Sequence, residues 1–412
     1  MQTIYVYFDD FRVDSPMLMG CLFAQPSRGK EIFSFEFDKE WLKTPYCRLL
    51  DPDLQLFTGR QFLADTKTNF GIFTDSAPDR WGRVLLERRE SIRSKDEQQP
   101  RLTLMESDFL LGVNDATRMG AIRLKTNIEG AFLDDDNQYT TPPFTSLREL
   151  EQASWHLEND NDPNMRKWLQ ILLTPGSSLG GARPKANVLD PNGSLWIAKF
   201  PSRSDRQDIG AWEAVAMQLA RACGINVSDF DIVRFNQHAT FLTKRFDRTP
   251  DGKRIHFTSA MTMLGYSDGN TDGCSYLELA EWISRNSCQV QEDLEELWKR
   301  IVFNIAISNC DDHLRNHGFL LSEKGWKLSP AYDLNPSYFG SGLSLNIDEH
   351  SNALDFGLAA DVAPYFGLSA TKSAQIITLV KQQVSSWRTW AKHYHIPPRE
   401  DQEIMSQAFK IN

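Results

Sequence analysis

The most constraining feature of this sequence is a dense polar cluster that follows its most regular amphipathic helix pattern. Between residues 292 and 308 apolar side chains recur at helical spacing, for example at Leu294, Leu297 and Ile301. The residues that follow, 309–316, read NCDDHLRN. Because a hydrophobic core has no need for so many adjacent polar side chains, we interpret the cluster as part of a functional site.

Two members of this cluster, Asp311 and Asn316, lie five positions apart. The catalytic loop of protein kinases has the same spacing: its aspartate accepts the proton of the substrate hydroxyl, and its asparagine binds magnesium through the amide oxygen. Asp312 is an alternative for the base, and only the spacing to Asn316 favours Asp311. A histidine in such a loop, here His313, more often orders the backbone than binds a metal, so we expect it to support the nucleotide site.

A second carboxylate for the metal is expected further along the chain. Apolar runs at 318–321 and 326–328 flank a turn at 322–325, and together they predict a hairpin that leads to Asp333. Kinases have the same order of elements between the catalytic loop and the metal-binding aspartate: the loop is followed by a strand, a turn, a second strand and the aspartate. We therefore expect Asn316 and Asp333 to be the metal ligands.

A glycine-rich segment precedes these residues. Backbone N–H groups approach a phosphate closely where glycines leave room, and Gly176, Gly180 and Gly181 lie within six residues. On its own such a cluster is more often an ordinary turn. Here a hairpin is predicted directly after it, with strands at 186–189 and 194–200 around a DPNG turn.

The second strand of that hairpin carries Lys199 between apolar neighbours. A cation on a rigid strand is what the phosphates of a nucleotide require, although an edge-strand lysine that points to solvent is an equally simple explanation. Glu213 lies on a helix predicted at 208–223 and is a natural ion-pair partner for this lysine. Its alternative interpretation is an ordinary solvated helix glutamate.

The remaining pattern predicts an α+β protein. A turn-rich opening is followed by an acidic connection at 134–143 and, after about residue 275, by a mainly helical part. Further elements are expected as strands at 3–8, 31–37, 230–235 and 240–246 and as a helix at 371–393.

Length and composition bound the function classes. With 412 residues the chain is expected to form two or three subdomains, and its formal charge of −10 argues against autonomous binding of nucleic acid. The basic stretch at 80–93 is interleaved with acidic residues, as on a solvated helix. The six cysteines are scattered, and this predicts reduced thiols and no structural metal. We find neither a leader pattern nor a bilayer-spanning run, so we expect a cytoplasmic protein without membrane contact.

Residues 268–278 begin like an EF-hand loop, yet the acidic residue falls one position early and Leu279 occupies the place of the bidentate glutamate. We therefore expect a turn-rich surface loop in place of a calcium site. A capping residue is expected before a helix at 276–283.

Five ordered motifs resemble those of the HipA family, the kinase toxins of bacterial type II toxin–antitoxin modules. The resemblance implies a two-lobed, protein-kinase-like fold with a β-rich N-terminal subdomain at 1–145, an ATP-binding lobe at 146–250 and a helical lobe at 251–412. The motifs are FTDSAPDRWGR at 73–83, SLGGARPK at 178–185, KRFDR at 244–248, NCDDHLRN at 309–316 and YD at 332–333.

The resemblance also implies roles for single residues. Lys199 would bind the phosphates of ATP, Asp311 would be the catalytic aspartate, and Asn316 and Asp333 would hold Mg²⁺. Lys244 and Phe246 would hold the adenine by backbone groups. Ser178 lies where such kinases carry an autophosphorylated serine, and the adjacent Ser177 leaves the modified position open.

Partners follow from the same resemblance. A HipA-like serine/threonine kinase pairs with a small helix-turn-helix antitoxin of the HipB type, reaches DNA only through it, and phosphorylates a protein such as an aminoacyl-tRNA synthetase. Two alternatives stay open: a catalytically silent, kinase-shaped partner of a DNA-binding repressor, and a phosphotransferase that acts on a small molecule.

Overall fold

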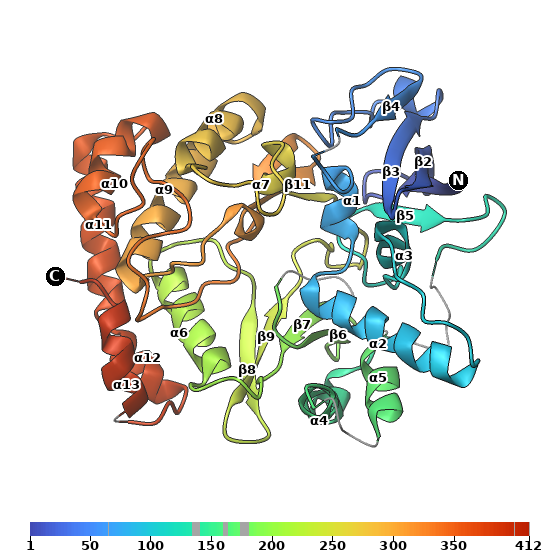
Figure 1. Cartoon of the computed structure of the whole chain (residues 1–412). Coiled ribbons are helices and arrows are strands. Elements are labelled where there is room, and N and C mark those ends of the chain that lie inside the picture. Colours follow the sequence, from blue (N-terminus) through green and yellow to red (C-terminus); the bar gives the residue numbers. More distant parts are fainter. Residues whose placement is uncertain (65, 134–140, 160–163, 174–180, 399, 412) are drawn as a thin grey trace. The chain divides into compact units, whose positions relative to one another are not determined.

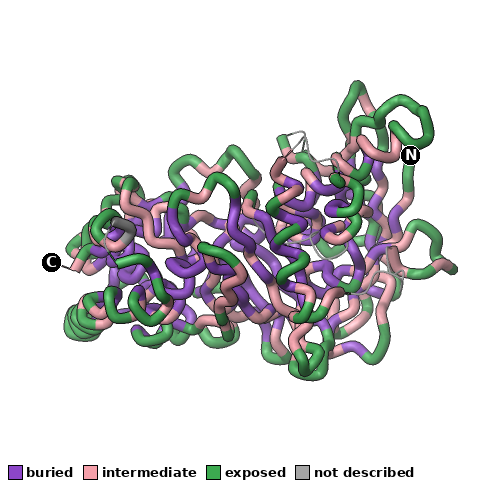
Figure 2. The backbone as a smooth tube through the Cα atoms, turned by 90° about the horizontal axis from the view of Figure 1, so that it is seen from below, coloured by how far each residue is buried: buried purple, intermediate pink, exposed green. Residues whose placement is uncertain are grey.

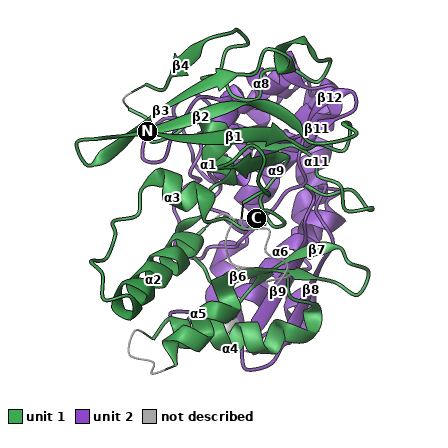
Figure 3. Cartoon of the chain, turned by 90° about the vertical axis from the view of Figure 1, so that its right-hand side faces the viewer, with its two compact units in different colours: residues 1–203, 247–258 green, residues 204–246, 259–412 purple. Residues whose placement is uncertain are grey.

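The structure is a computed structural model that describes the chain except for residues 65, 134–140, 160–163, 174–180, 399 and 412 (Figure 1). The described residues form two compact units (Figure 3). Unit 1 comprises residues 1–203 and 247–258, and unit 2 comprises residues 204–246 and 259–412. The predicted α+β class is confirmed, while the three-part division with limits at 145 and 250 stays a prediction.

Unit 1 begins with a five-stranded antiparallel sheet of strand order β4-β3-β2-β1-β5. Its first strand buries Ile4, Val6 and Phe8 on one face, as the alternating pattern predicts. Strand β2 was not predicted; its Gly20 packs so closely on β3 that an added Cβ would lie 2.3 Å from the Glu36 carbonyl oxygen. The strands are β1 (Gln2–Phe8), β2 (Met17–Ser27), β3 (Lys30–Phe37), β4 (Arg60–Phe62) and β5 (Ile122–Lys125).

The rest of unit 1 consists of helices and of the predicted hairpin, whose strands β6 (Lys185–Leu189) and β7 (Leu195–Lys199) are antiparallel. The basic stretch at 80–93 lies in helix α2, where Arg93 pairs with Glu90 and Glu97 at helical spacing, as expected. The helices are α1 (Gly71–Ser76), α2 (Arg80–Asp96), α3 (Glu106–Leu111), α4 (Leu147–Leu157) and α5 (Met165–Leu173).

Unit 2 is mainly helical and contains two further hairpins, each antiparallel. The strands are β8 (Phe230–Arg234), β9 (Ala239–Lys244), β11 (Gly318–Ser322) and β12 (Gly325–Leu328), and β10 (Phe257–Ser259) lies where the chain passes between the units. The helices are α6 (Ile209–Ala222), α7 (Ala260–Met263), α8 (Tyr276–Asn286), α9 (Val290–Ile307), α10 (Phe356–Val362), α11 (Ala370–Val384), α12 (Trp387–His393) and α13 (Glu400–Met405).

Most residues of helix α9 are buried, so the helix forms part of the core of unit 2. Figure 2 draws the buried residues of the chain in purple. The α9 side chains Leu297, Trp298 and Ile301 are fully buried, and the indole of Trp298 donates to the Ala359 carbonyl at 2.9 Å. The predicted helix at 371–393 is wrong in one respect, because it is broken into α11 and α12. At the break the hydroxyls of Ser385 and Ser386 donate to carbonyls three residues back and compete with the helical ladder.

Among the described residues, none of the helices combines the length and the apolar character that crossing a lipid bilayer requires. All six cysteines are free thiols.

Candidate functional site

The polar cluster begins where α9 ends. Ser308 adopts the left-handed conformation, with φ of 50°, and this turns the chain out of the helix. The hydroxyl of Ser308 donates to the Ala408 carbonyl at 2.7 Å, which ties the turn to the C-terminal segment. The loop that follows is therefore anchored on a buried helix, and this gives its side chains fixed positions.

Asp312 is the buried carboxylate of this loop. Its Oδ2 atom accepts hydrogen bonds from the Tyr276 hydroxyl and, at 2.8 Å, from the Asn304 amide, and it lies 2.8 Å from Nε2 of His317. Burial alone would raise the pKa of Asp312, but the adjacent His317 lowers it, so the pKa stays below its ordinary value. Because this carboxylate is enclosed and occupied by three partners, it is unsuited to receive a substrate proton.

Asp311, by contrast, is exposed. Although its side chain reaches solvent, the surrounding protein removes part of its hydration, and this effect, together with the charges of Asp333 and Asp312, raises the pKa of Asp311, whereas His313 acts in the opposite direction. The charge of Asp333 is thus near enough to act on Asp311. The geometry separates the two candidate bases: Asp311 reaches solvent, and Asp312 holds the loop.

Asn316 lies in the 3₁₀ turn Leu314–Asn316 and is buried. Its amide nitrogen donates to the Asp311 carbonyl at 3.0 Å, so the amide oxygen remains as the possible metal ligand. The same turn is closed by the Asn316 N–H, which donates to the His313 carbonyl at 2.8 Å. His313 therefore supports the loop through its backbone, while in the described part of the chain its Nδ1 has no hydrogen-bond partner.

Asp333 follows the hairpin β11–β12, as predicted. It adopts the left-handed conformation, with φ of 59°, which is uncommon outside glycine and occurs often at functional sites. The amide of Asn335 donates to its Oδ1 at 3.3 Å. The adjacent Tyr332 donates from its hydroxyl to the Arg315 carbonyl at 2.6 Å and packs its ring 5.5 Å from that of Phe246.

The predicted adenine-binding residues lie at and just beyond the end of β9. Lys244 is half-buried and its N–H donates to the Asp229 carbonyl at 2.8 Å. Phe246 is also half-buried, and its contact with Tyr332 places it beside the segment that carries Asp333. Both residues belong to unit 2, like the polar cluster.

The loop at 268–278 is turn-rich and ends at a capping box formed by Ser275 and Glu278, which confirms the predicted cap. Both carboxylate oxygens of Asp268 accept from Arg315, at 2.8 and 2.7 Å. An aspartate of the EF-hand-like stretch thus braces the polar cluster. Among the described residues no group of three or more histidine, cysteine or acidic side chains is arranged to hold a metal ion.

The predicted phosphate-binding residues belong to different parts of the chain. Gly176, Ser177, Ser178 and Gly180 lie outside the described residues. Lys199 is half-buried at the end of β7 in unit 1. Glu213 is only 3 % exposed on α6 in unit 2, which excludes the solvated glutamate as an explanation.

The structure therefore brings Asp311, Asn316 and Asp333 together within unit 2. The convergence of Lys199 with these residues stays a prediction, because Lys199 belongs to unit 1. Sequence reasoning missed Tyr276, Asn304 and His317 as partners of Asp312. A polar Asn304 in the apolar stretch of α9 was the available signal.

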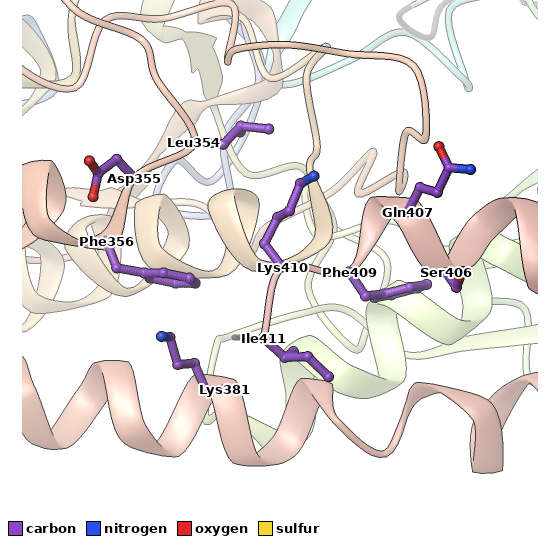
Figure 4. A pocket seen from close by; sticks show the side chains of 9 residues that line it. All are labelled: Leu354, Asp355, Phe356, Lys381, Ser406, Gln407, Phe409, Lys410 and Ile411. Atoms are coloured by element: carbon purple, nitrogen blue, oxygen red, sulfur yellow. The ribbon is translucent and has the colours of Figure 1, made fainter.

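A separate hollow of about 600 Å³ lies at the C-terminal end of unit 2 (Figure 4). Lys381 of α11, Phe356 and Lys410 contribute to its wall, and the Lys381 ammonium lies 4.5 Å from the centre of the Phe356 ring. The described residues that line it include none of the predicted site residues.

Comparison with known proteins gives a family. Residues 177–388 match the family described as HipA-like C-terminal domain. The putative kinase Y4mE of Sinorhizobium fredii is 25 % identical over 204 residues, which are 48 % of this chain and 42 % of that protein. The serine/threonine-protein kinase toxin HipA of Shewanella oneidensis is 26 % identical over 223 residues, 47 % of this chain and 50 % of that protein. The chain thus spans about half the length of these curated relatives.

A solved structure extends the likeness to the whole chain at the level of the fold. It is that of the Shewanella oneidensis MR-1 toxin–antitoxin complex of HipA, HipB and operator DNA. The TM-score is 0.65 at 17 % identity, with 98 % of this chain and 94 % of that chain covered. The predicted kinase-like α+β fold of the HipA type is confirmed by this match.

Proposed function

The chain belongs to the family of HipA-like proteins, and on that premise we propose that it is an ATP- and magnesium-dependent serine/threonine protein kinase. The observation that carries the proposal is the group of Asp311, Asn316 and Asp333 in unit 2. Within it Asp311 is exposed while its neighbour Asp312 is buried and occupied. Phosphoryl transfer needs such an accessible carboxylate beside oxygen ligands for a metal.

The donor set fits magnesium. This ion prefers oxygen ligands and is usually held by one or two protein side chains together with the phosphates of the nucleotide. The amide oxygen of Asn316 and the carboxylate of Asp333 would supply these ligands. When bound, the ion neutralises negative charge on the β- and γ-phosphates.

The remaining chemistry belongs to the side chains of the protein. Asp311 would orient the substrate hydroxyl and accept its proton. The loss of part of its hydration, which is the largest cause of the raised pKa of Asp311, makes this carboxylate a better base than a fully hydrated aspartate. Lys199, paired with Glu213, would hold the phosphates, and the backbone at Lys244 and Phe246 would hold the adenine.

Self-modification is part of the proposal. Phosphate on Ser178, or on the adjacent Ser177, would add about two negative charges beside the phosphate-binding segment and so oppose binding of ATP. Gly176, Gly180 and Gly181 would supply the backbone of that segment.

The partners are proposed on the same basis. The solved relative is a complex of HipA with HipB and operator DNA, which supports a helix-turn-helix antitoxin of the HipB type as partner and an indirect contact with DNA. We further propose a protein substrate of the translation apparatus, such as an aminoacyl-tRNA synthetase, and a cytoplasmic location.

The test is transfer of labelled γ-phosphate from ATP–Mg²⁺, with the purified chain alone and with added bacterial extract. The variants are Asp311→Ala and, as a matched control, Glu323→Gln, an exposed carboxylate in the β11–β12 turn. We expect labelled protein with the wild type and the control, and none with Asp311→Ala. Label found only in a small molecule, or nowhere, would refute the proposal.

A further inference from the structure

The motif at 73–83 has no role in the proposed chemistry, yet it contains a buried carboxylate, Asp79, whose two oxygens both accept hydrogen bonds. Asp79 caps α2: its Oδ1 accepts from the Gly82 N–H at 2.6 Å. Its Oδ2 accepts from the ammonium group of Lys185 at 2.8 Å. Both residues belong to unit 1, although they are 106 positions apart in sequence.

The motif contacts both the side chain and the backbone of Lys185, the first residue of β6. Its ammonium group bonds to Asp79, and its carbonyl accepts from the indole nitrogen of Trp81 at 3.1 Å. The Lys185 side chain is 2 % exposed and that of Asp79 is 5 % exposed. Water therefore cannot replace either partner, and the position of β6 relative to α2 is fixed.

The same ammonium group reaches the glycine-rich segment. It donates to the Gly181 carbonyl at 3.2 Å. Gly181 has φ of +100°, and a Cβ added there would lie 3.3 Å from the lysine nitrogen. The backbone at Gly181 is thus in direct contact with a cation that Asp79 holds in place.

The charge of Asp79 also affects the hairpin β6–β7. Lys185 and Lys199 are paired across the two strands, so their side chains leave the hairpin on the same face. Like charges at such positions repel each other. The carboxylate of Asp79 neutralises Lys185 and so permits a second cation, Lys199, opposite it.

A purely stabilising role explains these contacts poorly. A buried ion pair is often no more stable than well-packed apolar residues of the same size, because two charges have lost their water. What the pair provides beyond such residues is a defined position for the groups it touches. Here those groups are the Gly181 carbonyl, which precedes the hairpin, and the start of β6.

We propose that Asp79 and Trp81 are positioning residues for the nucleotide site: they fix Lys185 and, through it, the Gly181 end of the glycine-rich segment. The inference rests on the proposed kinase function, since it gives the fixed segment the task of receiving phosphate. A backbone position that is already held, as at Gly181, loses less conformational entropy when a ligand binds, so we expect the affinity for ATP to be higher.

The test compares Asp79→Asn and Trp81→Phe with the wild type. Asparagine keeps the helix cap and the shape of the side chain but removes the charge, and phenylalanine keeps the buried ring but removes the N–H donor. Glu106→Gln is the matched control: it weakens an ion pair that also starts on α2, the bidentate pair with Arg83 at 2.8 and 2.7 Å.

Two measurements are made on each variant. Hydrogen exchange of peptides covering residues 181–189 is followed without nucleotide, and KM and kcat for ATP–Mg²⁺ are measured in the labelled-phosphate assay. We expect faster exchange and a KM raised by about tenfold in Asp79→Asn, a smaller effect of the same kind in Trp81→Phe, and kcat changed less than KM. The control should match the wild type in both.

Unchanged exchange in both variants overturns the inference, and so does faster exchange with an unchanged KM. Trp81→Phe decides the matter if Asp79→Asn does not fold. A wild type that transfers no phosphate would refute the proposed function and the nucleotide-positioning role together, whereas an active wild type with unaltered variants would refute only the positioning role.

Discussion

Nε2 of His317 lies 2.8 Å from Oδ2 of Asp312, and both side chains are almost completely buried. This contact holds Asp312 inside unit 2, whereas the side chain of the preceding residue, Asp311, is exposed. Two adjacent aspartates thus have opposite environments, and the difference leads to the first prediction.

Substitution of the two aspartates should separate activity from stability. Asp311→Asn should lower phosphotransfer by about 10²–10⁴-fold, the usual contribution of a general base, with little change in the melting temperature. Asp312→Asn should destabilise the fold by about 3–5 kcal/mol, because it leaves His317 without its buried carboxylate. Thermal melting followed by circular dichroism, together with the labelled-phosphate assay, checks both; equal melting temperatures for the two variants would contradict the assignment.

Asp333→Gly should abolish metal-dependent binding of ATP without loss of stability. The left-handed backbone at position 333 is unfavourable for most side chains, so glycine should raise the free energy of unfolding by about 1 kcal/mol. Calorimetric titration with ATP, with and without Mg²⁺, measures the first effect, and chemical denaturation measures the second. Asp333→Asn serves as the control, because asparagine has nearly the size of aspartate and, like it, tolerates the left-handed backbone conformation. Undiminished affinity of Asp333→Gly for ATP–Mg²⁺ would exclude Asp333 as a ligand.

A double-mutant cycle tests the convergence of Lys199 with Glu213. If the two side chains form an ion pair, Lys199→Met and Glu213→Gln should each raise KM for ATP, and the double variant should be no worse than the poorer single variant. The expected coupling is about 0.5–3 kcal/mol. Additive effects would show that the two residues act independently, and the predicted pocket would then be wrong.

The stability of unit 1 should depend on pH through His256. Complete burial, with a smaller effect of Arg12, lowers the pKa of His256 from 6.5 to about 3. The unfolded chain therefore binds a proton below pH 6.5 that the folded chain does not bind, and stability must fall as pH falls from 6.5 towards 3. Above pH 6.5 the histidine is neutral in both states and has no effect. The melting temperature of His256→Gln should fall less steeply over this range; identical slopes would contradict the prediction.

Local chemistry determined much of the result from the sequence alone. The period of α9, the hairpins around the DPNG turn and before Asp333, and the spacing of Asp311 and Asn316 depend on neighbouring residues, so their patterns are visible in one dimension. The HipA resemblance and the α+β class followed from the order of these patterns along the chain.

Tertiary structure decided which of these side chains are available. The sequence could not separate Asp311 from Asp312, because burial depends on Tyr276 and His317, which approach from other elements. Nor did the sequence indicate that Asp79 and Lys185 meet, because these residues lie 106 positions apart and their contact leaves no periodic pattern in the sequence. The spacing of apolar residues predicts which face of a helix or strand is buried. Which residue pairs with a buried charge, by contrast, depends on how elements that are distant in sequence pack together.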